Sequence, residues 1–287
     1  MVETFVNLIV QGVLIGGLYA LFALGLSLSL GVMRFVNIAH GDMIVLFSFV
    51  ILSLTGALGW SPFLVALILI PVAFGTGYVL QRFLLQRTVG KGILPILLVT
   101  FGLSIIIQNG LLEAYGPNTR KLSGGAIELA AFRVGPMDIG VYPLLVLGLA
   151  VALIAGLDTF LYRTAIGARI RAVSDDPAAA DLIGLTSARI YPIAMGVIAI
   201  TMLAAASCMS VWTNFDPAIG PSRLLAAFEA VVLGGLGSLW GTLAGGVIIG
   251  IAQNFGSQID ASWQILAQHL VFLVALILRP QGLFARG

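Results

Sequence analysis

Long apolar runs recur along the whole chain and constrain its fold more than any other feature. A helix needs roughly 20 apolar residues to cross the hydrocarbon layer of a membrane. Runs of that order stand at 93–112, 141–161 and 190–211. Hydrophobic residues make up 60% of the 287 positions and charged residues only 9%, against about 25% charged residues in ordinary globular chains. A soluble domain could not bury so much apolar surface, and the sequence therefore predicts a membrane protein.

The spans are predicted to be helices. The alternation of period two that marks a membrane barrel is absent, and residues 144–157 are apolar on all sides. We expect an all-α polytopic membrane protein with one transmembrane domain over 1–287. About eight hydrophobic segments are expected, near 5–31, 43–59, 62–80, 93–112, 140–161, 190–212, 225–254 and 265–278.

Lysine and arginine positions predict which side of the membrane each connection faces. Cations gather in a short connection at 82–91, in 162–189 and near the C-terminus, so we expect these three regions, the C-terminus included, to be cytoplasmic. The segments 113–139 and 213–224 and the N-terminus are expected outside. The nine cations are Arg82, Arg87, Lys91, Arg163, Arg169, Arg171, Arg189, Arg279 and Arg286.

Segment 225–254 is longer than one span needs and is interrupted by a glycine-rich stretch around Gly235 and Gly237. We expect two short or half helices that meet near 234–241, with this break shaping a solute pathway; a single tilted helix is the alternative. Glu229 lies in the same segment, and an acid inside a membrane helix is by default functional. Pairing with Arg223, or a role at a helix start, is the other interpretation.

A second break is expected near 31–42, where polar residues lie between two apolar segments. A discontinuous helix lined by protein would explain them. In that interpretation Asn37 and His40 form hydrogen bonds across the break and Gly41 lets the backbone turn. In the other, this is a short interfacial loop and Asp42 caps the next helix. Both interpretations stay open on the sequence alone.

The cytoplasmic segment 162–189 contains a signal for a short helix. Asp176 suits an N-cap, Pro177 suits the first helical position, and Gly184 suits the stop. This pattern predicts a helix of about two turns outside the lipid, either as a docking element for a soluble partner or as a solvated loop.

Motifs for catalysis and for cofactors are missing from the sequence. No phosphate-binding loop of the Gly-x-x-x-x-Gly-Lys-Ser/Thr kind is present, so this chain is not expected to bind ATP by that route. His40 and His269 lack a ligand pattern, and no basic face suits nucleic acid. We expect no enzyme active site, no metal site, no cofactor in this chain and no nucleic-acid partner.

These regions together resemble the permease subunits of branched-chain amino acid ABC importers, the LivH type. The likeness covers nearly the full length, and four ordered matches carry it. They are Gly16–Leu21 with Gly31–Met33 and Asn37–Gly41; Arg171–Val173 with Pro177–Ala180 and Ile183–Gly184; Ala230–Ser238; and Arg279–Phe284. The broader importer signature has Glu-Ala-Ala before its spaced glycine, and here Ala178 stands in place of the glutamate.

The resemblance implies a coupling helix that docks on a separate ATP-hydrolysing subunit, which uses ATP and Mg²⁺. Its residues would be Asp176, Pro177, Ala178, Ala179, Ala180, Asp181 and Gly184. It also implies a second permease (LivM-like, or a second copy of this chain), two ATP-binding subunits, a periplasmic substrate-binding protein and a bacterial inner membrane as the location. The expected substrate is a branched-chain or other hydrophobic amino acid, or a related small amide or acid, moved by alternating access.

Two other function classes are weighed against this one. A secondary transporter or solute channel would work without an ATPase, and would usually carry internal repeats or a midplane ion site. A structural subunit of a redox complex would carry histidines that ligate a cofactor, for which His269 alone is a weak candidate.

Overall fold

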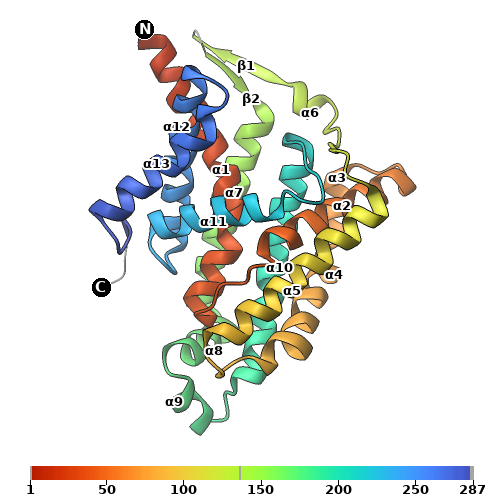
Figure 1. Ribbon diagram of the computed structural model, residues 1–287, viewed down its shortest axis with the longest axis vertical. Coiled ribbons are helices and arrows are strands. Elements are labelled where there is room, and N and C mark those ends of the chain that lie inside the picture. Colours follow the sequence, from red (N-terminus) through yellow and green to blue (C-terminus); the bar gives the residue numbers. More distant parts are fainter. Residues whose placement is uncertain (1, 136, 285–287) are drawn as a thin grey trace.

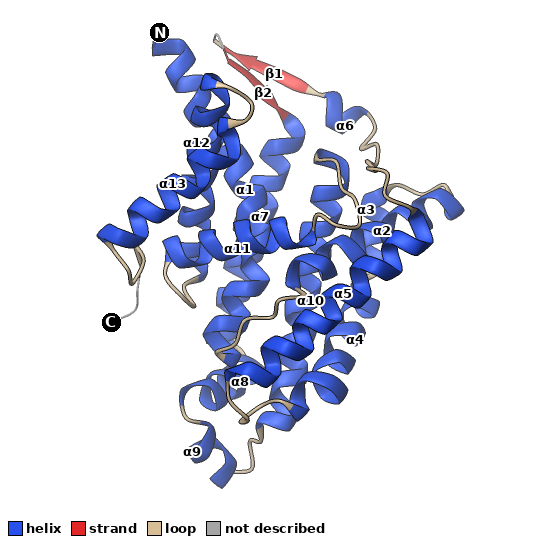
Figure 2. Cartoon of the chain, viewed as in Figure 1, coloured by secondary structure: helices blue, strands red, loops and turns tan. Residues whose placement is uncertain are grey.

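The computed structural model describes residues 2–135 and 137–284, and most of them are helical (Figures 1 and 2). The helices are α1 (Val2–Met33), α2 (His40–Leu58), α3 (Pro62–Ile68), α4 (Ile70–Val79), α5 (Ile93–Tyr115), α6 (Ala126–Leu129), α7 (Val141–Arg163), α8 (Ala165–Asp175), α9 (Pro177–Leu182), α10 (Ser187–Trp212), α11 (Gly220–Gly234), α12 (Leu239–Ile259) and α13 (Trp263–Leu278). A π-helical turn at Leu80–Leu84 and a 3-10 turn at Leu85–Arg87 follow α4.

The expected membrane architecture is confirmed. In the described part of the chain, five helices are long and apolar enough to cross a membrane: α1, α2, α5, α7 and α10. Two bent pairs also qualify, namely α3 with Ile70–Arg87 at 49° and α11 with α12 at 117°, and α13 is a shorter apolar helix. Each of the eight predicted hydrophobic segments corresponds to one of these units.

The half-helix arrangement predicted near 234–241 is also confirmed. Helix α11 ends at Gly234, α12 begins at Leu239, and the 117° bend between them excludes a single tilted helix. Gly235 and Gly237 have φ of 99° and 78°, a backbone region that glycine adopts without steric cost. The helix can end and the chain can bend sharply here because both positions are glycine.

Helix α1 forms the centre of the molecule, and α12 packs closely along it (Figure 1). Small residues allow this approach. A Cβ added to Gly16 would lie 2.5 Å from Val247 Cα, and one added to Gly250 would lie 2.3 Å from Gly12 O. Bare backbone on both helices therefore replaces side-chain interdigitation, which is a common way for helices to associate in lipid.

Some of the elements predicted on opposite sides of the membrane lie at opposite ends of the molecule, whereas the end of α13 lies about midway between them (Figure 1). The start of α1 and the hairpin of β1 (Ala131–Val134) and β2 (Met137–Gly140) are at one end, and α8 and α9 are at the other (Figure 1). The 82–91 connection lies beside the start of α10, because Arg82 donates to Ala188 O at 2.8 Å. Arg286, counted above among the cytoplasmic cations, is outside the described residues.

Two elements were not expected from the sequence. The antiparallel hairpin, with Ala131 opposite Gly140 and Val134 opposite Met137, spans the end of the segment 113–139, for which no strands were predicted. Helix α8 directly precedes α9, in the segment 162–189 for which only one short helix was predicted.

Candidate functional site

Helix α2 begins deep inside the protein. The Nε2 atom of His40 lies 2.8 Å from Phe22 O, and Phe22 precedes the end of α1 by eleven residues, or about 16 Å of helix. The segment after Met33 therefore folds back alongside α1. Asn37 stabilises the return, because its Oδ1 accepts a hydrogen bond from Ala39 N at 3.1 Å.

The break near 31–42 is thus a discontinuous segment whose second half is largely buried. Asn37 and His40 are each only 1% exposed, which contradicts the interfacial-loop interpretation. His40 bonds across the break to α1, as expected, whereas Asn37 bonds locally. The Nδ1 atom of His40 is buried without a hydrogen-bond partner among the described residues.

Gly41 was predicted to let the backbone turn, but in the structure it allows two helices to pack closely. It lies in the first turn of α2, and a Cβ there would stand 1.9 Å from Gly220 O at the start of α11. A Cβ on Gly220 would in turn stand 2.0 Å from Asp42 Oδ1. The N-termini of α2 and α11 therefore meet backbone to backbone in the interior.

Asp42 is not the helix cap that the alternative interpretation assigned to it. Ala39 occupies the cap position, without a side-chain cap bond. Asp42 is 1% exposed; its Oδ2 accepts a hydrogen bond from Ser104 of α5 at 2.6 Å, and Gln108 donates to Ser104 at 3.0 Å. Its Oδ1 has no partner, and no cation lies within 4 Å among the described residues. Asp42 therefore links α2 to α5 through Ser104.

Glu229 lies well inside α11 and is 1% exposed. It accepts a hydrogen bond from Gln268 Nε2 at 2.7 Å and forms a close one with His269 Nδ1, both on α13. Pairing with Arg223 and a role at the helix start were both wrong. Instead, the Arg223 guanidinium lies 5.4 Å from the centre of the Phe22 ring. Glu229 therefore ties the half helix α11 to α13.

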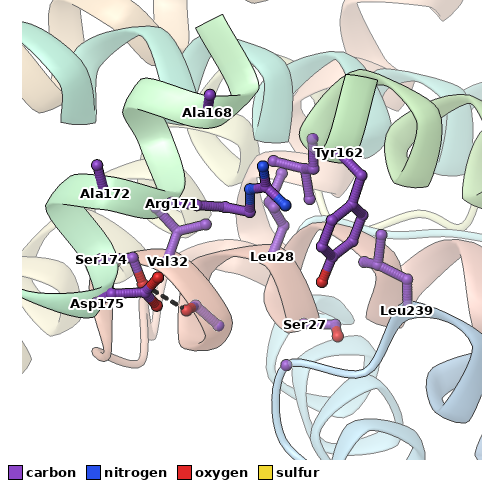
Figure 3. Close-up of a pocket in the computed structure, with 13 residues that line it drawn as sticks. Ser27, Leu28, Val32, Tyr162, Ala168, Arg171, Ala172, Ser174, Asp175 and Leu239 are labelled. Carbon is purple, nitrogen blue, oxygen red and sulfur yellow. Dashed lines mark hydrogen bonds between the residues drawn. The ribbon is translucent and has the colours of Figure 1, made fainter. Parts of the chain in front are cut away.

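A cavity of about 490 Å³ opens where the end of α1, the α7–α8 corner and the loop after α11 meet (Figure 3). Gly237 from that loop and Gly31 from α1 both line it, and a Cβ on Gly31 would lie 3.0 Å from Gly237 Cα. Gly235 packs against the C-terminal tail, where Leu283 N donates to Leu233 O at 2.9 Å. The two glycines chosen from the sequence thus lie at contact points between distant segments.

Helix α9 has the caps that the sequence predicted. Asp176 Oδ1 accepts hydrogen bonds from Ala178 N and Ala179 N, each at 3.0 Å, and Pro177 occupies the first position. At the other end Gly184 has φ of 81°. Its N–H bonds to Asp181 O at 3.0 Å, and Leu185 N bonds to Ala180 O at 2.9 Å, as in a Schellman stop.

The surface of α9 is apolar at its tip. Leu182 is 90% exposed and Ile183 72% exposed, and α9 lies at the far end of the molecule from the hairpin (Figure 1). Single exposed apolar residues are ordinary, but two adjacent ones on a doubly capped helix form a ready contact surface.

The candidate residues therefore occupy separate places. Asn37, His40 and Gly41 lie at the α2–α11 junction, Glu229 lies between α11 and α13, and the coupling residues lie on α9. Sequence reasoning missed Ser104, Gln108 and Gly220, as well as the contact of Glu229 with α13. A usable signal existed for two of these residues, since Ser104 and Gln108 stand four residues apart in an otherwise apolar run.

Comparison with known proteins gives full-length matches. The permease BraD of the high-affinity branched-chain amino acid transport system of Pseudomonas aeruginosa is 28% identical over 98% of this chain and 96% of its own length. The corresponding LivH of Escherichia coli is 25% identical over the same shares. A probable LivH of Methanocaldococcus jannaschii is 26% identical over 96% of this chain and 92% of its own length. No solved structure matches significantly.

The pattern that defines the family described as "Branched-chain amino acid transport system / permease component" matches residues 8–278. That range includes every helix from α2 to α13 and most of α1. The chain belongs to the family of branched-chain amino acid transport system permease components.

Proposed function

We propose that this chain supplies one permease subunit of an ATP-binding-cassette importer for branched-chain or other hydrophobic amino acids, or related small amides or acids. The relatives that match along the full length are permeases of branched-chain amino acid transport systems. The observation that carries the assignment is α9, a helix capped at both ends that presents Leu182 and Ile183 at one end of a membrane bundle. A span-to-span linker does not need those features.

In this proposal α9 is the coupling helix of a cytoplasmic loop at 162–189, within one transmembrane domain over 1–287. Asp176, Pro177, Ala178, Ala179, Ala180, Asp181 and Gly184 shape it. Two partner subunits bind and hydrolyse ATP with Mg²⁺, and this chain itself performs no catalysis. A second permease and a periplasmic binding protein complete an importer of the bacterial inner membrane, with the C-terminus of this chain in the cytoplasm.

The two discontinuous segments are proposed to line or border the translocation pathway. The residues assigned are Asn37, His40, Gly41, Glu229, Gly235 and Gly237. Support comes from the polar groups held at the start of α2, since interrupted backbone in a membrane protein is tolerated beside a cavity or within protein. Alternating access then requires that the solute bind the two states with different affinity.

The coupling assignment is tested by changing the tip of α9. Leu182→Asp places a charge on a side chain that is already 90% exposed, so the fold of this chain should not change. We expect the variant to lose most of the ATPase subunit that co-purifies with the wild-type complex and to lose leucine uptake. The matched control is Leu129→Asp, which changes a side chain 85% exposed at the opposite end of the molecule.

Retention of the ATPase and normal uptake by Leu182→Asp would refute the coupling role of α9. Uptake of leucine by this chain in vesicles that contain no ATPase would favour a secondary transporter or solute channel instead.

A further inference from the structure

The cavity beside α8 is not accounted for by the roles assigned so far, apart from Gly237 at its edge. Three segments far apart in the sequence build it: the last turns of α1, the α7–α8 corner, and the loop after α11 (Figure 3). Its volume of about 490 Å³ is in the range of small-molecule sites. Helix α8 leads directly into the coupling helix α9.

Two polar groups in the cavity wall are buried without a hydrogen-bond partner in the described structure. One is the hydroxyl of Ser27, a residue with no exposed surface. The other is Nε of Arg171, whose guanidinium lies 4.4 Å from the centre of the Tyr162 ring. Buried polar groups are nearly always satisfied in proteins, so unsatisfied ones in a cavity wall suggest a missing ligand.

The charges in the wall define the chemistry of that ligand. Arg171 and Asp175 stand one turn apart on α8 and both line the cavity, yet neither forms a salt bridge within the described residues. A guanidinium suits a carboxylate and a carboxylate suits an ammonium group. Leu28 and Leu239 add apolar wall. Opposite charges with aliphatic wall fit a zwitterion that carries an aliphatic side chain, and Asp175 disfavours a phosphate.

We propose that this cavity is a regulatory site in which the imported amino acid binds from the cytoplasmic side and inhibits its own import. The inference rests on the proposed function, because it takes α9 as the coupling helix. An occupant would bridge α8 to α1 and to the loop after α11. Any movement of α8 that accompanies ATP hydrolysis would change the cavity, so the ligand would favour the arrangement that it fits best.

The test uses the complete importer in proteoliposomes, with the ATPase subunits facing outward and the binding protein enclosed with leucine. L-Leucine is added outside, and ATP hydrolysis is measured. We expect external leucine to inhibit hydrolysis in the wild-type complex. Arg171→Ala should raise the half-inhibitory concentration at least about 10-fold, the loss expected for a hydrogen bond to a charged group. Arg169→Ala, an exposed cation on the same helix, should leave that concentration unchanged.

Two further arms separate a ligand site from a structural role of Arg171. Ser27→Ala removes an unpartnered hydroxyl, so it should weaken inhibition without impairing assembly. The probes 4-methylpentanoate and 3-methylbutylamine lack the ammonium and the carboxylate respectively, and each should inhibit at least about 10-fold less well than leucine.

Three results would overturn the inference. They are leucine import without any inhibition from the cytoplasmic side, equal inhibition in wild type and Arg171→Ala, and equal potency of leucine and 4-methylpentanoate. Each of them leaves the proposed function intact. A complex that hydrolyses ATP normally but imports no hydrophobic amino acid would instead contradict the proposed substrate.

Discussion

Adding a single methyl group at Gly41 should disrupt the contact between the N-termini of α2 and α11. The Cβ of an alanine there would lie 1.9 Å from Gly220 O and 2.8 Å from Leu224 N. Real Cβ atoms essentially never approach closer than 3.0 Å, so α11 would have to move by about 1 Å. The obstructing atoms are backbone, and a rotamer change cannot relieve the clash.

The magnitude follows from two opposing effects. Glycine to alanine in a helix gains up to about 1 kcal/mol of propensity, whereas overpacking costs about 1–3 kcal/mol, occasionally more. Gly56 provides the matched control, because it lies in the same helix and has nothing within 4 Å of an added Cβ. Gly56→Ala should be neutral or stabilising by about 1 kcal/mol. Gly41→Ala should be destabilising by up to about 2 kcal/mol, so the two variants should differ by about 1–3 kcal/mol.

Thermal unfolding of the detergent-purified chain, followed by tryptophan fluorescence, measures that difference. The usual scaling for domains of 150–250 residues is about 2–4 °C per kcal/mol, so Gly41→Ala should melt about 2–12 °C below Gly56→Ala. Leucine uptake by the full importer should fall in Gly41→Ala alone. Equal melting temperatures for the two variants would refute the close contact between Gly41 and Gly220.

Two further perturbations address polar contacts, one between α11 and α13 and one near the hairpin. Glu229→Ala leaves Gln268 Nε2 buried without its acceptor, so it should cost about 1–3 kcal/mol in thermal unfolding. Glu229→Gln keeps an acceptor and should cost clearly less; equal losses would contradict the bonding to α13. Near the hairpin, the Lys121 ammonium and Gly124 N–H hold the pKa of Glu128 below its usual value. This pairing should order residues 121–128 at pH values above the ordinary carboxyl pKa and should be lost as pH falls through the lowered pKa of Glu128. Glu128→Gln should reproduce the loss at neutral pH. Amide hydrogen exchange of residues 121–128, corrected for its intrinsic rate, would detect the loss in both cases, and unchanged exchange would argue against the pairing.

Local signals account for what the sequence predicted correctly. The bend after Gly234 needs only glycines whose backbone can take positive φ, and the caps of α9 need only Asp176 and Gly184 within eight positions. The helical spans follow from apolar runs of membrane length. Each of these features is determined by a few consecutive residues and can therefore be predicted from a single sequence.

Contacts between distant residues explain what the sequence could not predict. Ser104 meets Asp42 across 62 positions, and Gly220 meets Gly41 across a longer separation still. No local pattern says that a buried acid will find a hydroxyl on another helix, because the pairing exists only after the spans associate. Helix α8 was missed for another reason, since its charged face resembles a solvated loop when only composition is considered.

The contacts also explain how a small helix at one end could influence a polar junction in the interior. Ser174 of α8 donates a hydrogen bond to Gly31 O at 2.9 Å, and Gly31 packs on Gly237. From there α11 runs as one rigid helix of 15 residues, about 22 Å long, to Gly220, which touches Gly41 and Asp42. Three contacts and one helix therefore form a continuous connection from α8 to the start of α2. Coupling of this kind requires two discrete arrangements, and the glycine loop after α11 is the place where the backbone can supply them.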